Sequence, residues 1–253
     1  MKPKRGVIPL MLFLFLLTWV WVFAAVAASK ELTLAIGLAL PPYNIPETNS
    51  GMEFDIVREA LELKGYSIRP KYVPQGRRNL ELINREVDGV LTVNPDCGLE
   101  AFYSDEHIVY ENVVVSLKKN NFLIKDVQDL KDRSAVAFQQ AAIYLGKDFA
   151  DMAQANKRYK EIADQNLQIN LLYSGRAETI VLDKNIFYYL RTRNTRVDTT
   201  QPVTIHHIFQ PTPYRVAFLD KKVRDDFNEG LKELRKTSRY NAIIKNYVSE
   251  KRK

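Results

Sequence analysis

Cysteine and histidine are scarce in this chain. Cys97 is the one cysteine among 253 residues, so an internal disulfide is excluded, and no cysteine stands near residues 24–28 to anchor a lipoprotein. The histidines are His107, His206 and His207, and the adjacent pair on an extended segment would point to opposite faces. We therefore expect neither a metal site nor a cofactor.

A concentrated basic surface is lacking as well. The formal net charge is +7 at pH 7, but Lys and Arg are spread along the chain, and no basic stripe alternates with aromatic residues. A clustered basic patch is the usual electrostatic mark of a nucleic-acid-binding protein. We therefore exclude nucleic acid as a partner and interpret the paired basic residues as solvated surface.

The first part of the chain carries its longest hydrophobic run. A basic start precedes an almost wholly apolar run over residues 10–26, which ends in small residues. This three-part pattern predicts a secretory signal peptide over residues 1–28, cleaved after Ala27 or Ala28, and therefore a periplasmic protein. The alternative is an uncleaved anchor, because the run approaches the roughly 18–20 residues that span a bilayer.

The two tryptophans distinguish these alternatives. Trp19 and Trp21 both lie within the predicted signal peptide, and the sequence has no other tryptophan. We expect the exported protein to show tyrosine fluorescence without tryptophan emission. Tryptophan emission from the purified exported protein would show that the segment is retained.

Residues 31–93 predict alternating strands and helices. An alternating apolar run over 31–38 is typical of a strand, and two prolines stop it. Gly51 opens a segment whose apolar residues follow helical spacing up to Leu63. The order strand, helix, strand, helix, strand continues to residue 93. Such an order is the signature of a largely parallel sheet.

The rest of the chain predicts a second α/β set and a return to the first. Strands are expected over 109–117, 134–138, 158–162, 179–182, 203–208 and 214–219. Helices are expected from the segment 139–142 to about 156, and over 164–173, 185–193, 222–235 and 238–247. The stretch 168–173 could instead be a strand, but Gly175 in a C-cap position favours a helix. These elements predict an α/β protein of two lobes, the second inserted into the first.

Several short signals recur in an order that resembles one protein family. They are Pro41-Pro42-Tyr43 after a strand, Gly51 with Phe54-Asp55-Ile56, Leu82 to Asp88 before a strand, Tyr103-Ser104 ahead of Tyr110, Asp129-Leu130-Lys131 before Val136, Gly175-Arg176 before Ile180 to Asp183, and the closing helices Leu231 to Tyr247. The chain thus resembles the bacterial extracellular solute-binding proteins of the amino-acid-binding type (solute-binding family 3). The likeness covers nearly the whole mature chain.

The resemblance implies a periplasmic-binding-protein-like fold of type II, whose two lobes are joined by two hinge crossings and close on a small molecule. The first lobe would comprise residues 29–116 and 206–253, and the second lobe residues 117–205. The implied partners are a small polar solute and either an ABC permease or a membrane sensor. We expect a monomer.

The sequence departs from that family at the ligand carboxylate. Family members that bind amino acids carry an arginine in the loop ahead of the Tyr-Ser pair, where its guanidinium forks onto the carboxylate. Here residues 94–101 contain no arginine, and the usual Gly-Thr turn of the second lobe reads Gln-Gln-Ala-Ala at 139–142. Both contacts are missing, which argues against an ordinary α-amino acid as the ligand.

Ligands of open α/β sheets bind outside the carboxyl ends of the strands, and this rule selects the candidate residues. The predicted ligand-binding residues are Tyr43, Arg77, Arg78, Thr92, Asn94, Gln139, Gln140 and Asp183. The aromatic ring can stack on a ligand, one arginine can replace the missing clamp, and the glutamines suit a neutral polar group.

Each candidate also has a purely structural interpretation. The tyrosine can pack at the rim of a strand, and the arginines can be exposed surface. Thr92 and Asn94 can serve the turn chemistry that Asn-Pro favours. Asp183 can cap the following helix.

The leading hypothesis is an exported binding protein that works by lobe closure, without chemistry. One alternative is a sensory module that presents its ligand to a membrane receptor. Another is a dehydratase-like enzyme on the same fold, which would need a positioned acid or base. Glu100, Glu178 and Asp183 are the loose candidates, and no carboxylate pair or triad spacing supports them. We therefore expect a protein that is not an enzyme.

Overall fold

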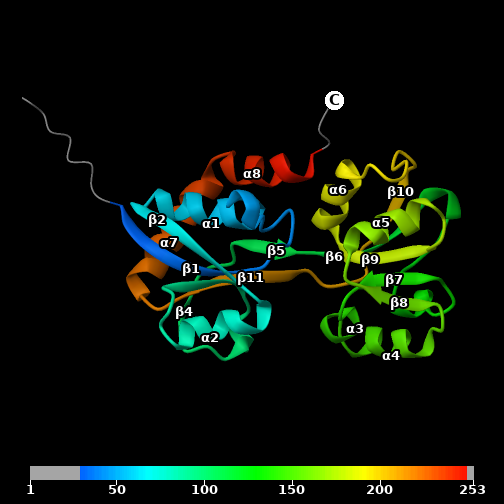
Figure 1. The fold of residues 1–253 in the computed structure, drawn as a ribbon, viewed down its shortest axis with the longest axis horizontal. Helices are drawn as coiled ribbons and strands as arrows, with labels where there is room; N and C mark the ends of the chain where they lie inside the picture. The colour runs from blue at the N-terminus through cyan, green and yellow to red at the C-terminus, as the bar shows by residue number, and fades with distance from the viewer. Residues whose placement is uncertain (1–28, 250–253) are drawn as a thin grey trace, which may run out of the picture.

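The computed structural model describes residues 29–249, so the predicted signal peptide lies outside them. Two sheets form two lobes that lie side by side (Figure 1). The strands of the first sheet are β1 (Lys30–Gly37), β2 (Tyr66–Val73), β3 (Gly89–Val93), β4 (Phe102–Tyr103), β5 (Ile108–Tyr110) and β11 (Thr212–Phe218). Those of the second sheet are β6 (Asn112–Leu117), β7 (Ala135–Phe138), β8 (Tyr159–Ile162), β9 (Thr179–Asp183) and β10 (Val203–His206). This arrangement confirms the predicted two-lobed α/β class.

Strand order shows how the second lobe is inserted into the first. The first sheet has the order β2-β1-β3-β11-β4, with β5 paired to β11, and the second has the order β10-β6-β9-β7-β8. In the first sheet β1 is parallel to β2 and β3, whereas β11 is antiparallel to β3. Because β11 follows β10 in sequence but lies in the first sheet, the chain leaves that lobe and returns to it.

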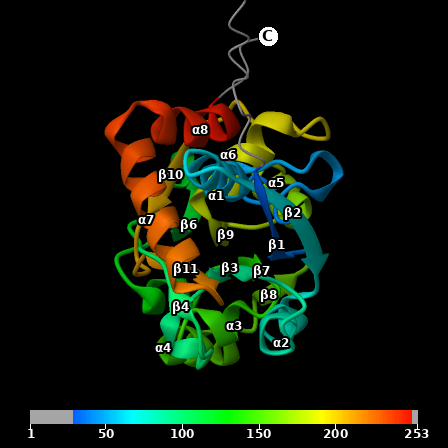
Figure 2. The same ribbon diagram turned by 90° about the vertical axis from the view of Figure 1, so that its left-hand side faces the viewer.

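Helices cover the sheets on both sides. They are α1 (Met52–Glu62), α2 (Arg78–Ile83), α3 (Ala141–Tyr144), α4 (Lys147–Ala155), α5 (Gln165–Tyr173), α6 (Lys184–Arg193), α7 (Lys221–Lys236) and α8 (Arg239–Val248). Figure 2 shows α1 and α8 above the strands of the first lobe and α2 below them. Short 3-10 turns lie at 46–48, 75–77, 95–97, 118–120 and 127–130. Within residues 29–249, no helix combines the length and hydrophobicity needed to cross a membrane.

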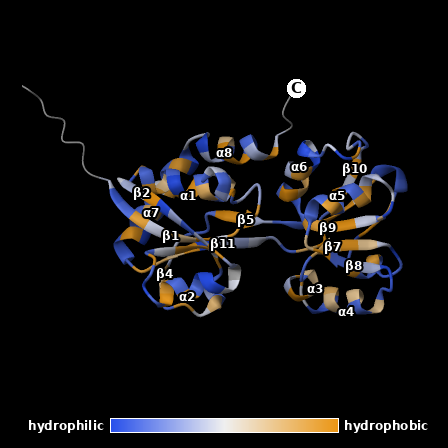
Figure 3. Cartoon of the chain, in the orientation of Figure 1, coloured by the Kyte–Doolittle hydropathy of each residue, from blue (hydrophilic) through white to orange (hydrophobic). Residues whose placement is uncertain are grey.

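The hydrophobic core joins the lobes along one side only. One continuous cluster includes Leu34 and Phe54 of the first lobe and Ile180 and Phe187 of the second. Hydrophobic residues on β5 and β9 mark this region in Figure 3. On the side of α2 and α4 the cores are separate clusters, one in each lobe. No shared hydrophobic cluster of the described residues therefore joins the lobes on the α2 and α4 side.

Two crossings connect the lobes, and the first was placed wrongly by the sequence pattern. Residues 109–117 are not one strand: β5 pairs with β11, and β6 pairs with β9. Glu111 separates them, because its backbone N–H donates to the Asp183 side chain instead of to a neighbouring strand. The predicted boundary at 117 therefore falls at the end of β6, which belongs to the second sheet. Residues 207–211 form the second crossing.

The helix predicted to run to about 156 is also interrupted. Gly146, with φ 88°, separates α3 from α4 because a left-handed residue cannot continue the helix. The preference for a helix near residues 165–173 is confirmed by α5. Asp164 caps its start by accepting from Asn166 N at 2.9 Å.

The contact between α1 and α7 requires a glycine. A Cβ atom on Gly230 would lie 2.0 Å from the carbonyl oxygen of Ala60. Because such overpacking moves whole elements apart, Gly230→Ala should lower the free energy of unfolding by about 3 kcal/mol in urea denaturation. Gly76→Ala is the matched control, since a Cβ there meets nothing within 4 Å. Equal stability of the two variants would contradict the close packing of these helices.

Candidate functional site

A hydrogen bond between the lobes joins two of the predicted residues. Tyr43 follows β1 of the first lobe, and its hydroxyl donates to Asp183 Oδ1 at 2.8 Å at the end of β9. Asn185 Nδ2 donates to the same hydroxyl oxygen at 3.1 Å. Tyr43 has no exposed surface. The strand-end rule therefore located a contact between the lobes, formed by residues far apart in sequence.

Asp183 serves several partners at once. Its Oδ1 also accepts from the backbone N–H groups of Asn185 and Ile186 at 2.8 and 3.0 Å, which caps α6, and its Oδ2 accepts from Glu111 N at 2.9 Å. The residue is 4% exposed. Burial raises the pKa of Asp183 to about 6, although these donors favour the charged form. Asp183 thus ties the second lobe to Tyr43 and to the first crossing.

This raised pKa predicts how stability varies with pH. Because the folded pKa of Asp183 of about 6 lies above the ordinary value of 3.8, the folded state holds the proton more tightly. The contribution of protonated Asp183 to the free energy of unfolding is complete below the unfolded pKa, and it is lost as the pH rises through about 6. Between about pH 7 and about pH 4.5, wild type should gain about 2 kcal/mol of unfolding free energy relative to Asp183→Asn. Parallel pH profiles of the two proteins in chemical denaturation would contradict it.

A second carboxylate, Glu53 on α1, is buried completely in the first lobe. Its Oε1 accepts from Thr92 Oγ1 at 2.8 Å and lies 2.9 Å from His107 Nε2, and its Oε2 accepts from Tyr110 OH at 2.8 Å. Asn44 Nδ2 donates to the same oxygen at 3.4 Å. Burial alone would raise the pKa of Glu53, but the hydrogen bonds from His107, Thr92 and Tyr110 lower it overall. Glu53 therefore organises the polar interior beneath the site.

Stacked tyrosines connect the two carboxylates. The rings of Tyr43 and Tyr110 stack at 3.8 Å between centroids with an interplanar angle of 24°. Tyr214 on β11 meets Tyr110 edge-on at 4.8 Å. The ladder of three rings runs from the contact between the lobes into the first sheet, and offset or edge-on aromatic pairs are the favoured arrangements.

Glu111 links the two crossings. Its carboxylate contacts Lys184 Nζ and His207 Nδ1, and His207 lies in the second crossing. Burial would raise the pKa of Glu111, but these two partners lower it overall. A rotation of the lobes about the crossings would therefore change this cluster directly.

The structure brings only part of the predicted set together. Tyr43, Asp183 and Thr92 belong to one network through Glu53 and the tyrosines. Arg78 is buried beside it, where its Nη1 donates to Leu91 O at 2.7 Å.

The other four predicted residues lie outside the network. Arg77 is exposed and lies 3.8 Å from Glu81 in an ion pair. Asn94 caps the turn after β3 by accepting from Asp96 N at 3.1 Å. Gln139 is exposed. Gln140 adopts φ 66°, and its backbone N–H donates to Glu161.

Sequence reasoning missed Glu53, His107, Tyr110 and Tyr214. A glutamate in the first turn of an amphipathic helix usually faces solvent, so nothing marked Glu53 as buried. His107 was weighed only as a metal ligand. Within residues 29–249, no group of three His, Cys, Asp or Glu side chains is placed to hold a metal ion. Glu178 is one of the candidates for catalysis. Its carboxylate accepts from Arg158 Nη2 at 2.6 Å and from Ser134 N at 2.7 Å.

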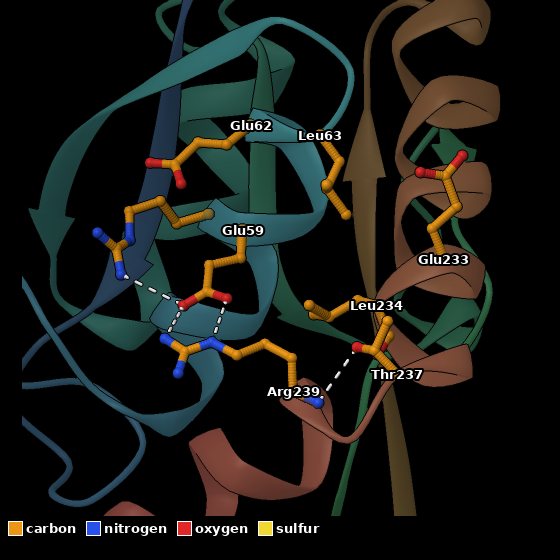
Figure 4. A pocket seen from close by; sticks show the side chains of 8 residues that line it. Glu59, Glu62, Leu63, Glu233, Leu234, Thr237 and Arg239 are labelled. Carbon is orange, nitrogen blue, oxygen red and sulfur yellow. Dashed lines mark hydrogen bonds and ion pairs between the residues drawn. The ribbon is translucent and has the colours of Figure 1, made fainter.

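Two hollows lie at different places on the described surface. One of about 500 Å³ is beside the crossings, where Asn112, Ile208 and Thr212 face Tyr144 of α3. Another of about 730 Å³ is on the outside of the first lobe between α1 and α7 (Figure 4). There the Glu59 carboxylate pairs with Arg239 at 2.6 Å. Neither hollow shares a lining residue with the tyrosine network, but only the one beside the crossings is lined by residues of both lobes, so the site between the lobes is the better candidate.

No family model matches the sequence. Solved structures do match the fold. The substrate-binding protein of a polar amino acid ABC uptake transporter from Streptococcus thermophilus has a TM-score of 0.66 at 18% identity over 87% of each chain. Substrate-binding domain 2 of Lactococcus lactis GlnP, in an open conformation, has a TM-score of 0.65 at 17% identity over 87% of this chain and 95% of that one.

A histidine kinase sensor domain that is similar to periplasmic binding proteins also matches. Its TM-score is 0.64 at 16% identity, over 88% of this chain and 97% of that one. At these identities the likeness establishes the shared two-lobed binding-protein fold.

Proposed function

We propose that this chain is an exported solute-binding protein that captures a small polar molecule between its lobes by hinge closure. The hydrogen bond between Tyr43 and Asp183 supports this most directly, because it joins the lobes at the carboxyl ends of β1 and β9. Ligands of open α/β sheets bind at that place.

The two crossings support a hinge. They are Glu111 and residues 207–211, and the Glu111 carboxylate contacts both. Outside the crossings, the cores on the α2 and α4 side are separate, so rotation there disrupts no common core. Hinge closure around a ligand needs a few residues at element ends that absorb the backbone change.

We propose that the bound solute is delivered to an ABC transporter, because one matching structure is described as the substrate-binding protein of an ABC uptake transporter and another as a substrate-binding domain. The match to a histidine kinase sensor domain favours a ligand-sensing module as the second candidate. Permease and ATPase genes next to the coding gene would favour transport. A neighbouring sensor kinase gene would favour sensing.

A thermal-shift screen against a broad metabolite library tests the binding function. A ligand that binds only the native state raises stability by about 2.7 kcal/mol at a hundred times its Kd. We expect a small polar compound to raise the unfolding temperature of wild type. If no compound does so, and none binds in equilibrium dialysis, the proposed function is wrong.

A further inference from the structure

Arg78 is a buried cation without a counter-ion. It is 5% exposed, and within residues 29–249 its guanidinium makes no ion pair with Asp or Glu. Its Nη1 donates to the carbonyl oxygens of Leu91 at 2.7 Å and Thr92 at 3.5 Å, while its Nε has no hydrogen-bond partner in the described part of the chain. A buried charge is costly unless it is paired, so an unpaired guanidinium points to an anion that the protein itself does not provide.

The strand end beside Arg78 is strained. Thr92 adopts φ 58°, the left-handed region that β-branched residues avoid. In this conformation its hydroxyl donates to Glu53 at 2.8 Å while its carbonyl faces Arg78 at 3.5 Å. Such outliers persist where the surrounding structure holds them and gather at binding sites. The strain therefore adds a second observation at the same place.

A chain of contacts links this place to the second lobe through Tyr110, which stacks on Tyr43, whose hydroxyl donates to Asp183. Arg78 Nη1 lies 3.5 Å from the carbonyl oxygen of Thr92, and the Thr92 hydroxyl donates to Glu53, which also accepts from Tyr110 OH at 2.8 Å. At the other end of the tyrosine ladder, Tyr214 meets Tyr110 edge-on and is only partly buried.

The buried carboxylates are not free for a ligand ammonium group. Asp183 accepts four hydrogen bonds from within the protein and is 4% exposed. Glu53 is completely buried and is contacted by four protein side chains. An α-amino acid bound at Arg78 would therefore find a cation for its carboxylate, whereas neither Asp183 nor Glu53 is free to pair with its amine.

We propose that Arg78 is the anion receptor of the site between the lobes, and that the solute is a short carboxylate without an α-amino group. This inference rests on the proposed solute-binding function and narrows its ligand class. The receptor comes from the start of α2, not from the loop 94–101, which has no arginine. A planar guanidinium can donate two parallel hydrogen bonds to a carboxylate.

Matched compounds on one carbon skeleton test the ligand class. The probes are short carboxylates, each with its neutral amide and its α-amino acid, for example succinate, succinamide and aspartate. In calorimetry with wild type we expect at least one carboxylate to bind, and its amide and amino acid to bind at least about tenfold more weakly, because a charge-assisted hydrogen bond is lost or an ammonium group is buried unpaired.

Variants of the two neighbouring arginines assign the effect to Arg78. Arg78→Met should weaken carboxylate binding by about 10- to 100-fold, and Arg77→Met, at an exposed position, should not change it. Without ligand, Arg78→Met should unfold at the same temperature as wild type or higher, because an uncompensated buried charge is removed. Arg78→Lys retains the charge without the fork and should bind with intermediate affinity, which keeps the test open if the methionine variant does not fold.

Three results would overturn the inference while the binding function stands: equal affinity for the amide, tighter binding of the amino acid, or full carboxylate affinity in Arg78→Met. Binding of only neutral or cationic library compounds would overturn it as well. If the library screen finds no ligand at all, the proposed function fails together with this inference.

Discussion

Replacing Glu53 with alanine should lower the free energy of unfolding by about 3–5 kcal/mol, because each buried group left without its hydrogen-bond partner costs about 1–3 kcal/mol. The substitution leaves the hydroxyls of Thr92 and Tyr110 and the ring of His107 without their acceptor. These groups surround a side chain with no exposed surface, so water does not replace the lost partner. Urea denaturation followed by circular dichroism measures the change.

Glu62→Ala is the matched control for this variant. Glu62 lies on the same helix but is exposed, so its replacement should change stability by less than about 0.5 kcal/mol. Glu53→Gln keeps an acceptor of the same shape and should lie between wild type and Glu53→Ala. A loss below about 1 kcal/mol in Glu53→Ala would mean that the carboxylate does not organise the first lobe.

Asp183→Ala should also cost about 3–5 kcal/mol of unfolding free energy. The change removes the cap of α6, worth about 1 kcal/mol, and leaves Tyr43 OH and Glu111 N without their acceptor in the interior. Asp164→Ala removes a cap of the same kind from α5 at an exposed position. It should cost only about 1 kcal/mol. Equal losses in the two variants would show that Asp183 acts as a cap alone.

The fold was predictable because its signals are local. Alternating runs such as 31–38 and amphipathic segments such as 222–235 specify their elements within a few residues. The order of these elements then leaves few arrangements of a parallel sheet. Where a backbone group binds a distant side chain, the local signal fails. Glu111 divides one apolar run between two sheets because its N–H donates to Asp183.

The sequence predicted site residues correctly only where the strand topology fixes their position. Tyr43 and Asp183 follow strands whose carboxyl ends meet between the lobes, and the rule for strand ends selected both. Gln139 and Asn94 follow strands too, yet they are exposed outside the network, because that rule places a residue at an edge and does not orient its side chain. Glu53 and His107 contact each other although 54 positions separate them in the sequence. No local pattern encodes such a pairing.

The central claim is that the lobes close on a small molecule, and small-angle scattering tests it most directly. The radius of gyration is measured for wild type alone and with a saturating ligand from the thermal-shift screen. We predict that the ligand lowers the radius of gyration, because closure brings the α2 and α4 sides of the lobes together. An unchanged radius with a tightly bound ligand would contradict hinge closure.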